Sequence, residues 1–186
     1  MGEPKLNLIL DSRRIEKYQP LIDELKRQKI VNYELWPCLM YPKVVNSINA
    51  SHKMIVWDAK EKGLKECYIG EDDLMFPSDH GWQWFLKNKP IIFDIYSAGN
   101  YLSFDRPKEP GAVKVDCIVG FHLYIIQERF YDTFLSTPDD QHIDTAQKGE
   151  LFVCYPMPGL QRAGFSANNM AECNYNAVLN DEDIYK

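Results

Sequence analysis

The chain has 186 residues, of which 45% are hydrophobic and 13% aromatic, and a formal net charge of −6. This length and composition are typical of one ordered globular domain with a substantial core. The negative charge argues against nucleic acid as a partner, because domains that bind a phosphate backbone usually carry a basic patch.

The first half of the chain alternates strand-like and helix-like segments. Apolar runs bounded by polar residues indicate strands, and apolar residues at helical spacing indicate helices. In chain order, the predicted elements are a strand at 6–10 ending at Asp11, a helix at 18–30, a strand at 33–36 stopped by Pro37, a helix from a cap at Asn46 or Ser47 to Gly63, a strand ending at Ile69 and a short helix from Ser78 or Asp79 to Phe85.

The second half is richer in strands. The predicted elements are strands at 90–95, 112–119 and 120–126, a helix at 128–135 and a last strand at 151–155. The polar, acidic segment 168–186 is expected to be a loosely held tail. We expect one domain over residues 1–186, built on a mainly parallel α/β sheet flanked by helices, with mixed strands in the second half.

The five cysteines are scattered, without a Cys-x-x-Cys pair. This pattern is typical of reduced thiols in the cytoplasm and indicates neither a zinc site nor a disulfide framework. The apolar run at 6–10 is too short for a signal peptide or a transmembrane helix. We therefore expect a cytoplasmic chain without a transmembrane segment, and leave peripheral membrane contact open.

Three consecutive carboxylates, Glu71, Asp72 and Asp73, follow the apolar strand that ends at Ile69. Adjacent charges at the end of a buried strand are costly unless a partner neutralises them. A divalent cation is one such partner, since Mg²⁺ and Mn²⁺ prefer oxygen ligands and keep substrate phosphates in their remaining positions. The alternative is a solvated acidic turn. In α/β sheets ligands bind outside the carboxyl ends of the strands, where Asp11 and this triplet would lie.

The pair Ser51-His52, followed by a helix and then by Gly70-Glu71-Asp72-Asp73, resembles the Ser-His … Glu-Asp-Asp pattern of the family 25 glycosyltransferases, which add sugars during lipooligosaccharide synthesis. Further matching elements, in the same chain order, are Leu8 to Asp11 with Arg13 and Arg14, the strand at 120–126, Pro138 to Asp140, and Tyr155 to Gln161 with Ser166. The chain departs from the family pattern at Gly70, where a bulky apolar residue is usual.

This resemblance implies a GT-A-like fold, a nucleotide-diphosphate sugar donor, a glycan or glycolipid acceptor of the cell-surface polysaccharide type, and Mn²⁺ or Mg²⁺ as cofactor. Asp73 is the preferred direct metal ligand, with Asp72 and Glu71 bound through water or contacting the ribose. The metal would stabilise the charge that develops on the departing diphosphate. A bend at Gly70 would help the carboxylates to serve one site.

Other residues have predicted roles around the same donor. Arginine suits phosphate geometry, so Arg13 and Arg14 are candidates for the diphosphate, the alternative being a solvated turn. The resemblance adds Asp11 and Gln161 as donor-binding residues. Ser51 and His52 belong to the same predicted set; His52 would contact the donor or orient an acidic ligand, and the alternative is a histidine satisfied within the core.

An inverting transfer, which the resemblance implies, needs a general base for the acceptor hydroxyl, and a carboxylate commonly supplies it. Asp140 is the preferred candidate because it matches the Pro-x-Asp of the family, with Asp144 as the second. The alternative for Asp140 is a helix-terminating turn that favours aspartate.

The sequence therefore predicts a metal-dependent glycosyltransferase of the hexosyltransferase type. Two alternatives stay open: a nucleotide-sugar-binding remnant that lacks turnover, and a metal-dependent nucleotidyltransferase or phosphoesterase. The segment Asp11 to Arg14 lacks the glycine-rich loop expected of a nucleotidyltransferase. The sequence gives no oligomeric state.

Overall fold

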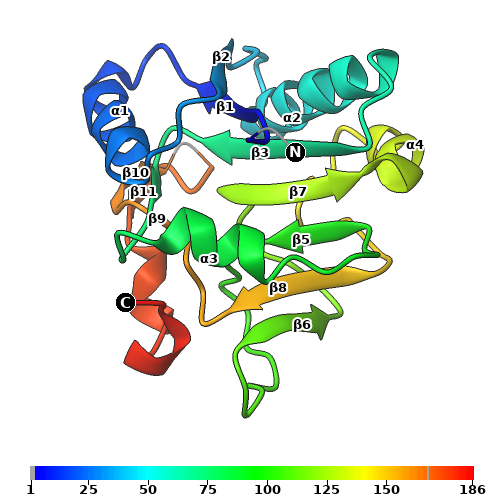
Figure 1. Ribbon diagram of the computed structural model, residues 1–186. Coiled ribbons are helices and arrows are strands. Elements are labelled where there is room, and N and C mark those ends of the chain that lie inside the picture. The colour runs from blue at the N-terminus through cyan, green and yellow to red at the C-terminus, as the bar shows by residue number, and fades with distance from the viewer. Residues whose placement is uncertain (1–2, 167) are drawn as a thin grey trace.

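The computed structural model of the protein describes residues 3–166 and 168–186. Its centre is a seven-stranded sheet with the strand order β2-β1-β3-β7-β5-β8-β6 (Figure 1). These strands are β1 (Leu6–Leu10), β2 (Tyr33–Pro37), β3 (Glu66–Glu71), β5 (Ile95–Ser97), β6 (Gly111–Val115), β7 (Leu123–Gln127) and β8 (Leu151–Tyr155). Two small sheets pair β4 (Leu74–Met75) with β9 (Leu160–Gln161) and β10 (Gly164–Ser166) with β11 (Ala171–Cys173).

The helices flank this sheet on both faces. They are α1 (Tyr18–Arg27), α2 (Val44–Glu61), α3 (Gly81–Lys87) and α4 (Tyr131–Leu135), with short 3-10 helices η1 (Ile15–Lys17), η2 (Glu128–Phe130), η3 (Tyr175–Val178) and η4 (Asp181–Asp183). Figure 1 shows α1 and α3 on the near face of the sheet. Over the described residues, no helix combines the length and the apolar character that crossing a membrane requires.

The prediction of an α/β fold is confirmed, but the sheet is mixed and not mainly parallel. Strand β1 pairs in parallel with β2 and β3, and β5 pairs in parallel with β8. The other pairings, β3 with β7, β5 with β7 and β6 with β8, are antiparallel. The physical reason lies in the connections: a parallel pair needs a long crossover, usually a helix, whereas antiparallel strands do not. Long crossover helices occur only in the first half of the described chain.

Side chains that alternate along the central strands divide the core into two layers. Ile69 and Tyr124 pack with α2 and α4, and their neighbours Tyr68 and Leu123 pack with α1 and α3. Successive strand residues point to opposite faces, so a buried strand must be apolar on both sides. This explains why β3 and β7 read as continuous apolar runs in the sequence.

Several predicted boundaries differ from the structure. Helix α2 begins at Val44, so neither Asn46 nor Ser47 is its cap. Instead, Ser47 lies within the helix and its Oγ accepts a hydrogen bond of 2.8 Å from the backbone N–H of Tyr41. The strand predicted at 90–95 begins only at Ile95, and Ile91 is exposed. Local sequence did not decide these ends because tertiary contacts compete with capping propensity.

The segment after residue 168, predicted to be loosely held, makes specific contacts with the rest of the protein. Asp183 is buried and accepts two hydrogen bonds from the guanidinium of Arg106, at 2.5 and 2.8 Å. The ring of Tyr185 stacks on Trp84 with 4.5 Å between centroids. A polar composition did not reveal these contacts because both partners lie far away in the sequence.

Gly70 lies inside β3 and contributes room rather than a bend. A Cβ at this position would lie 2.9 Å from the methyl Cδ2 of Leu8. Gly99 is more tightly enclosed, since its Cβ would lie 2.6 Å from the carbonyl oxygen of Gly159 and 2.8 Å from Nε2 of His122. The flexible end of a leucine moves aside more easily than a backbone carbonyl.

We therefore predict that Gly99→Ala lowers the free energy of unfolding by about 1–3 kcal/mol, the usual cost of overpacking a core. Gly70→Ala is the matched control and is expected to cost clearly less. Urea denaturation followed by circular dichroism measures both. An equal loss for the two variants would contradict this account of Gly99.

Candidate functional site

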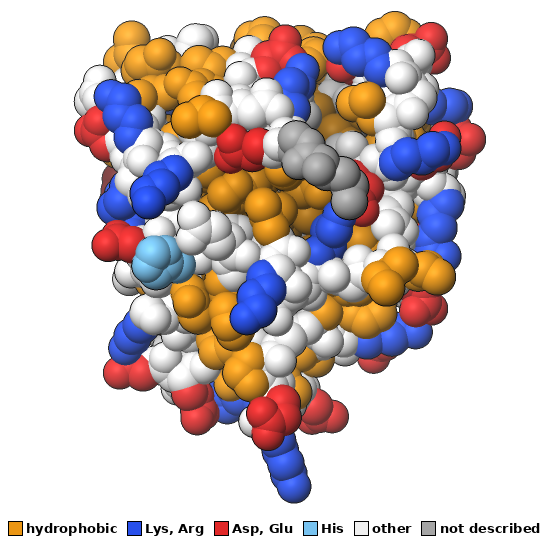
Figure 2. All heavy atoms as spheres, in the orientation of Figure 1, with side chains coloured by type: hydrophobic (Ala, Val, Ile, Leu, Met, Phe, Trp, Pro, Cys, Tyr) orange, Lys and Arg blue, Asp and Glu red, His pale blue; other side chains and the backbone are white. Residues whose placement is uncertain are grey.

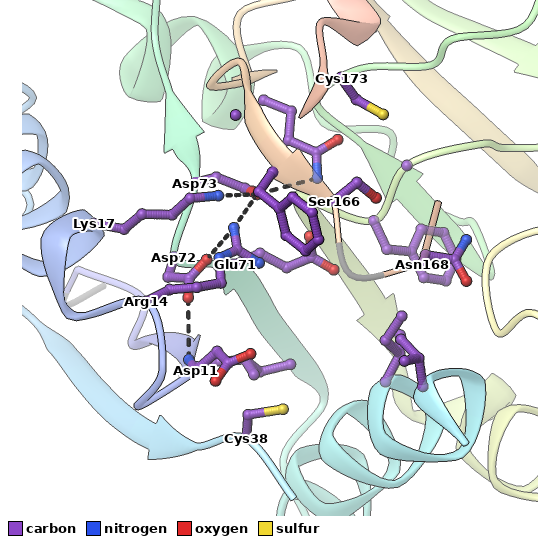
Figure 3. Close-up of a pocket in the computed structure, with 18 of the residues that line it drawn as sticks. Asp11, Arg14, Lys17, Cys38, Glu71, Asp72, Asp73, Ser166, Asn168 and Cys173 are labelled. Atoms are coloured by element: carbon purple, nitrogen blue, oxygen red, sulfur yellow. Dashed lines mark hydrogen bonds and ion pairs between the residues drawn. The ribbon is translucent and has the colours of Figure 1, made fainter. Parts of the chain in front are cut away.

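A cavity of about 350 Å³ lies at the carboxyl ends of β1 and β3 and is partly covered by the β10–β11 hairpin (Figure 3). Its size is within the range of small-molecule sites. The residues that were predicted to bind donor or metal and that line it are Asp11, Arg13, Arg14, Ser51, His52, Glu71, Asp72, Asp73 and Gln161.

The register of the parallel strands brings the first predicted residues together. Ile9 of β1 pairs with Glu71 of β3, so the residues that follow each strand meet at one edge of the sheet. The backbone N–H of Asp11 donates a hydrogen bond of 3.0 Å to Oδ2 of Asp72. The pairing of β4 with β9 then brings Gln161 beside the triplet, and its Nε2 lies 3.3 Å from Oδ2 of Asp73.

Two basic side chains from the start of the chain neutralise Asp72 and Asp73. Nη2 of Arg14 lies 2.9 Å from Oδ1 of Asp72 and 2.6 Å from Oδ2 of Asp73. Nζ of Lys17 lies 3.1 Å from the same oxygen of Asp73. Figure 3 shows these contacts converging on Asp73. Both aspartates are 4% exposed, so the ion pairs replace water that burial has removed.

Glu71 has a different partner. Its Oε1 lies 3.1 Å from Nε2 of His52, and Nδ1 of His52 lies 2.9 Å from the hydroxyl of Tyr124. Burial raises the pKa of Tyr124 well above its ordinary value, so this hydroxyl keeps its proton and donates to Nδ1. Nε2–H of His52 then donates to Glu71. His52, which is 1% exposed, therefore holds a carboxylate of the triplet from inside the core.

The two kinds of partner give the carboxylates different pKa values. Burial raises the pKa of Asp72 to about 7 against the opposing charge of Arg14. Burial and the charge of Glu71 raise the pKa of Asp73 to about 6. Burial is the largest influence on Glu71 and acts to raise its pKa, but the hydrogen bond from His52 and the charges of His52, His122 and Arg14 together lower the pKa below its usual range. Only Glu71 is thus stabilised as a carboxylate beyond its normal degree.

The predicted set of metal ligands, Asp73, Asp72 and Glu71, does not fit one divalent ion in this arrangement. Among the residues the structure describes, no group of three or more His, Cys, Asp or Glu side chains could hold a metal. Both oxygens of Asp72 have partners, and Glu71 turns to His52. Oδ1 of Asp73 is buried without a partner, but Arg14 and Lys17 sit on the other oxygen of that carboxylate. The positive charges of Arg14 and Lys17 would repel a metal cation bound to the same carboxylate.

The two predicted general bases do not line the cavity. Asp140 is exposed to solvent. Both oxygens of Asp144 accept backbone hydrogen bonds, from Gly120 at 2.9 Å and from Thr145 at 2.7 Å. Asp144 thus supports a loop of the cavity wall instead of facing the cavity. The segment is held in this position by Asn49 of α2, whose amide donates to the carbonyl of Gln141 at 2.6 Å.

Sequence reasoning missed several lining residues, chiefly Lys17, Tyr101, Arg162, Phe165 and Tyr175. Lys17 could have been predicted, because a residue three positions after Arg14 lies on the same side of a helical turn. The sequence gives no comparable signal for the other four residues. Tyr101, for example, reaches the site from a loop. Its hydroxyl accepts a hydrogen bond of 2.9 Å from the backbone N–H of Gln161.

Comparison of the sequence with protein-family models and with curated proteins gives no match. Among solved structures, the chain is similar to A197 from STIV, with a TM-score of 0.51 and 15% identity over 91% of this chain and 93% of that chain. At this identity the likeness shows a shared fold alone. The resemblance to family 25 glycosyltransferases stays a prediction.

Other similar structures have lower scores and include glycosyltransferases. One is a glycosyltransferase involved in the glycosylation of the major capsid of PBCV-1, with a TM-score of 0.37 and 11% identity over 70% of this chain and 63% of that chain. Another is a Drosophila beta-1,4-galactosyltransferase 7 mutant in complex with manganese, UDP-Gal and xylobiose, with a TM-score of 0.40 and 12% identity over 70% of this chain and 51% of that chain.

The raised pKa of Asp72 predicts a pH-dependent effect of Asp72→Asn. Because the folded protein favours the protonated carboxyl, this group lowers stability as the pH rises from about 4 to 7. Removing its charge should therefore help more at pH 8 than at pH 4. The difference in Tm between Asp72→Asn and wild type should become more positive over this range.

Differential scanning fluorimetry at several pH values measures this difference. Asp23→Asn, which removes an exposed carboxylate from α1, supplies the background effect of losing one surface charge. A Tm difference for Asp72→Asn that falls with rising pH would contradict the assignment.

Proposed function

We propose that the protein transfers a sugar from a nucleoside-diphosphate sugar to a hydroxyl acceptor. One observation carries this proposal: residues from positions 11–17, 51–52, 71–73 and 161 line a single cavity at the carboxyl ends of parallel strands. This is where open α/β sheets bind nucleotides and related ligands. Acidic, basic and amide groups converge there from segments that are distant in the sequence.

Stabilisation of the leaving diphosphate is assigned to Arg14 and Lys17. Both side chains line the cavity and are mostly shielded from solvent, with exposed fractions of 24% and 12%. Cationic groups already fixed in a partly dry site stabilise developing negative charge without reorganisation. Arg14 has further donor capacity, because its Nε is buried without a partner. The guanidinium can therefore contact phosphate oxygens while it stays paired with Asp72 and Asp73.

The cavity also has an apolar side suited to the flat faces of a nucleobase or a sugar ring. Tyr101, Phe121 and Phe165 line it, the last from the β10–β11 hairpin. Phe165 is 50% exposed although its ring is large and apolar. An aromatic ring left half in solvent at the mouth of a cavity is a natural stacking surface for a ligand.

The finer predictions from sequence belong to the same proposal. They are an inverting transfer, a glycan or glycolipid acceptor of the cell-surface polysaccharide type, and a cytoplasmic location. Dependence on Mn²⁺ or Mg²⁺ receives no support from the contacts of the triplet, so no step is assigned to a metal. We also keep the prediction that residues 1–186 form one domain.

A second candidate is a binding module that holds a nucleotide sugar without turnover. The specific observation in its favour is that Asp140 and Asp144, the predicted bases, do not line the cavity. It differs from the first candidate in one measurable outcome, which is release of the sugar from the donor.

We expect a nucleoside-diphosphate sugar to raise the Tm of the wild-type protein, because a ligand that binds only the folded state stabilises it by mass action. Lys17→Ala should weaken this shift by removing one of the two cations. Lys26→Ala, which removes an exposed lysine from α1, should leave it unchanged. A panel of UDP, GDP, ADP and CDP sugars, each with EDTA or with Mn²⁺, makes the test.

Release of nucleoside diphosphate from the donor that binds then separates a transferase from a binding module. If no sugar nucleotide shifts the Tm in either condition, the proposed function is lost. A shift that appears only with Mn²⁺ would show that the carboxylates exchange their basic partners for a metal.

A further inference from the structure

We infer that Glu71 is the general base of the transfer and that His52 is the residue that positions it. This inference rests on the proposed function and gives it a catalytic group, because neither carboxylate predicted for this role lines the cavity. Glu71 lines the cavity with a side chain that is 25% exposed, so it is accessible to an acceptor. Figure 3 shows it directed into the space between Asp72 and Ser166.

Glu71 differs from the other two carboxylates in its partners. Asp72 and Asp73 are paired with Arg14, and Asp73 also with Lys17. Both aspartates are 4% exposed, and Oδ1 of Asp73, the one oxygen of the pair without a partner, is itself buried. Neither carboxylate is therefore accessible to an acceptor hydroxyl. Among the described residues, the carboxylate of Glu71 has no arginine or lysine partner, and the one hydrogen bond to this side chain comes from a histidine.

One oxygen of Glu71 is committed and the other is available. Oε1 accepts the hydrogen bond of 3.1 Å from Nε2 of His52. Over the described residues, Oε2 has no hydrogen-bond partner. A general base needs this combination: an orientation fixed by one oxygen and a second oxygen free to contact the substrate proton.

His52 can fix this orientation because it is itself held from two sides. Its Nδ1 accepts from Tyr124 at 2.9 Å, and its ring lies against the ring of Tyr124 with 5.7 Å between centroids. Phe121 lies on the imidazole at 6.3 Å between centroids. Tyr124 is completely buried, and His52 borders the cavity but is only 1% exposed, so it acts through Glu71 and not on the substrate. His52 is therefore a positioning residue, and Glu71 is the catalytic one.

The chemistry balances as a single displacement. Oε2 of Glu71 removes the proton from the acceptor hydroxyl as the acceptor oxygen forms a bond to the anomeric carbon. The bond from that carbon to the diphosphate oxygen breaks, and its electron pair leaves with the diphosphate. Arg14 and Lys17 receive this charge at the other end of the triplet. When water is the acceptor, the same steps hydrolyse the donor.

Glu71→Gln tests the inference because glutamine keeps the shape of the side chain and the hydrogen bond from His52. We expect donor-induced Tm shifts close to those of wild type and a fall in sugar release of about 100-fold or more, the usual contribution of general base catalysis. Glu61→Gln, at the exposed end of α2, is the matched control and should keep full activity. Asp140→Asn is measured in parallel.

Azide provides a second, independent measurement, because it is a nucleophile with no proton to lose. Glu71→Ala in azide should form a glycosyl azide of inverted configuration at a rate well above its rate with water. His52→Gln should lower kcat while leaving the KM for the donor unchanged, and azide should restore turnover there too. A merely structural role for His52 would not respond to azide.

The outcomes separate the inference from the function on which it rests. Wild-type sugar release that survives in Glu71→Gln, or is lost in Asp140→Asn instead, overturns the role of Glu71 and leaves the transferase intact. Loss of donor binding in Glu71→Gln makes Glu71 a binding residue and also overturns the inference. Failure of wild type to release sugar from any donor overturns both.

Discussion

The structure of the site depends on the contact of one guanidinium with two buried carboxylates. Asp72 and Asp73 are almost removed from water, and uncompensated charges in that position would cost several kcal/mol each. Arg14 neutralises both from the connection between β1 and α1, and Lys17 adds a second charge from the next turn. These cations come from the segment between β1 and α1, and the two acids directly follow β3, so the contact joins two segments about sixty positions apart at one side of the cavity.

The antiparallel strand β7 gives the triplet its second kind of partner. Strand β7 lies beside β3 in the sheet and pairs with it in antiparallel orientation, not in the parallel one that the sequence predicted. Tyr124 of β7 faces the same layer as His52 of α2, and the two form the chain of hydrogen bonds that ends at Glu71. Three consecutive acids are thereby divided: two face cations and one faces a histidine. In the proposed reaction, the cations paired with Asp72 and Asp73 would stabilise the leaving group and Glu71 would take the proton.

The C-terminal third of the chain completes the site instead of trailing from it. Pairing of β4 with β9 brings Gln161 to Asp73, and the hairpin of β10 and β11 forms part of the wall. Asp183 and Tyr185 then attach the end of the chain to Arg106 and Trp84. Acidic and basic side chains are interspersed over the face drawn in Figure 2.

The sequence by itself determined the strands β1, β2, β3 and β8, the helix α1, and the convergence of Asp11 with the triplet, because apolar periodicity and the geometry of parallel strands are local or nearly local rules. It also gave His52 as a residue near an acidic group. Only the tertiary structure decided what each carboxylate binds. Whether a buried acid takes a metal, an arginine or a histidine depends on which groups lie within a few ångströms, and strand order sets those distances. Local rules say nothing of strand order. They therefore could not predict that the sheet is mixed, which partners the three acids take, or that Asp140 lies outside the cavity.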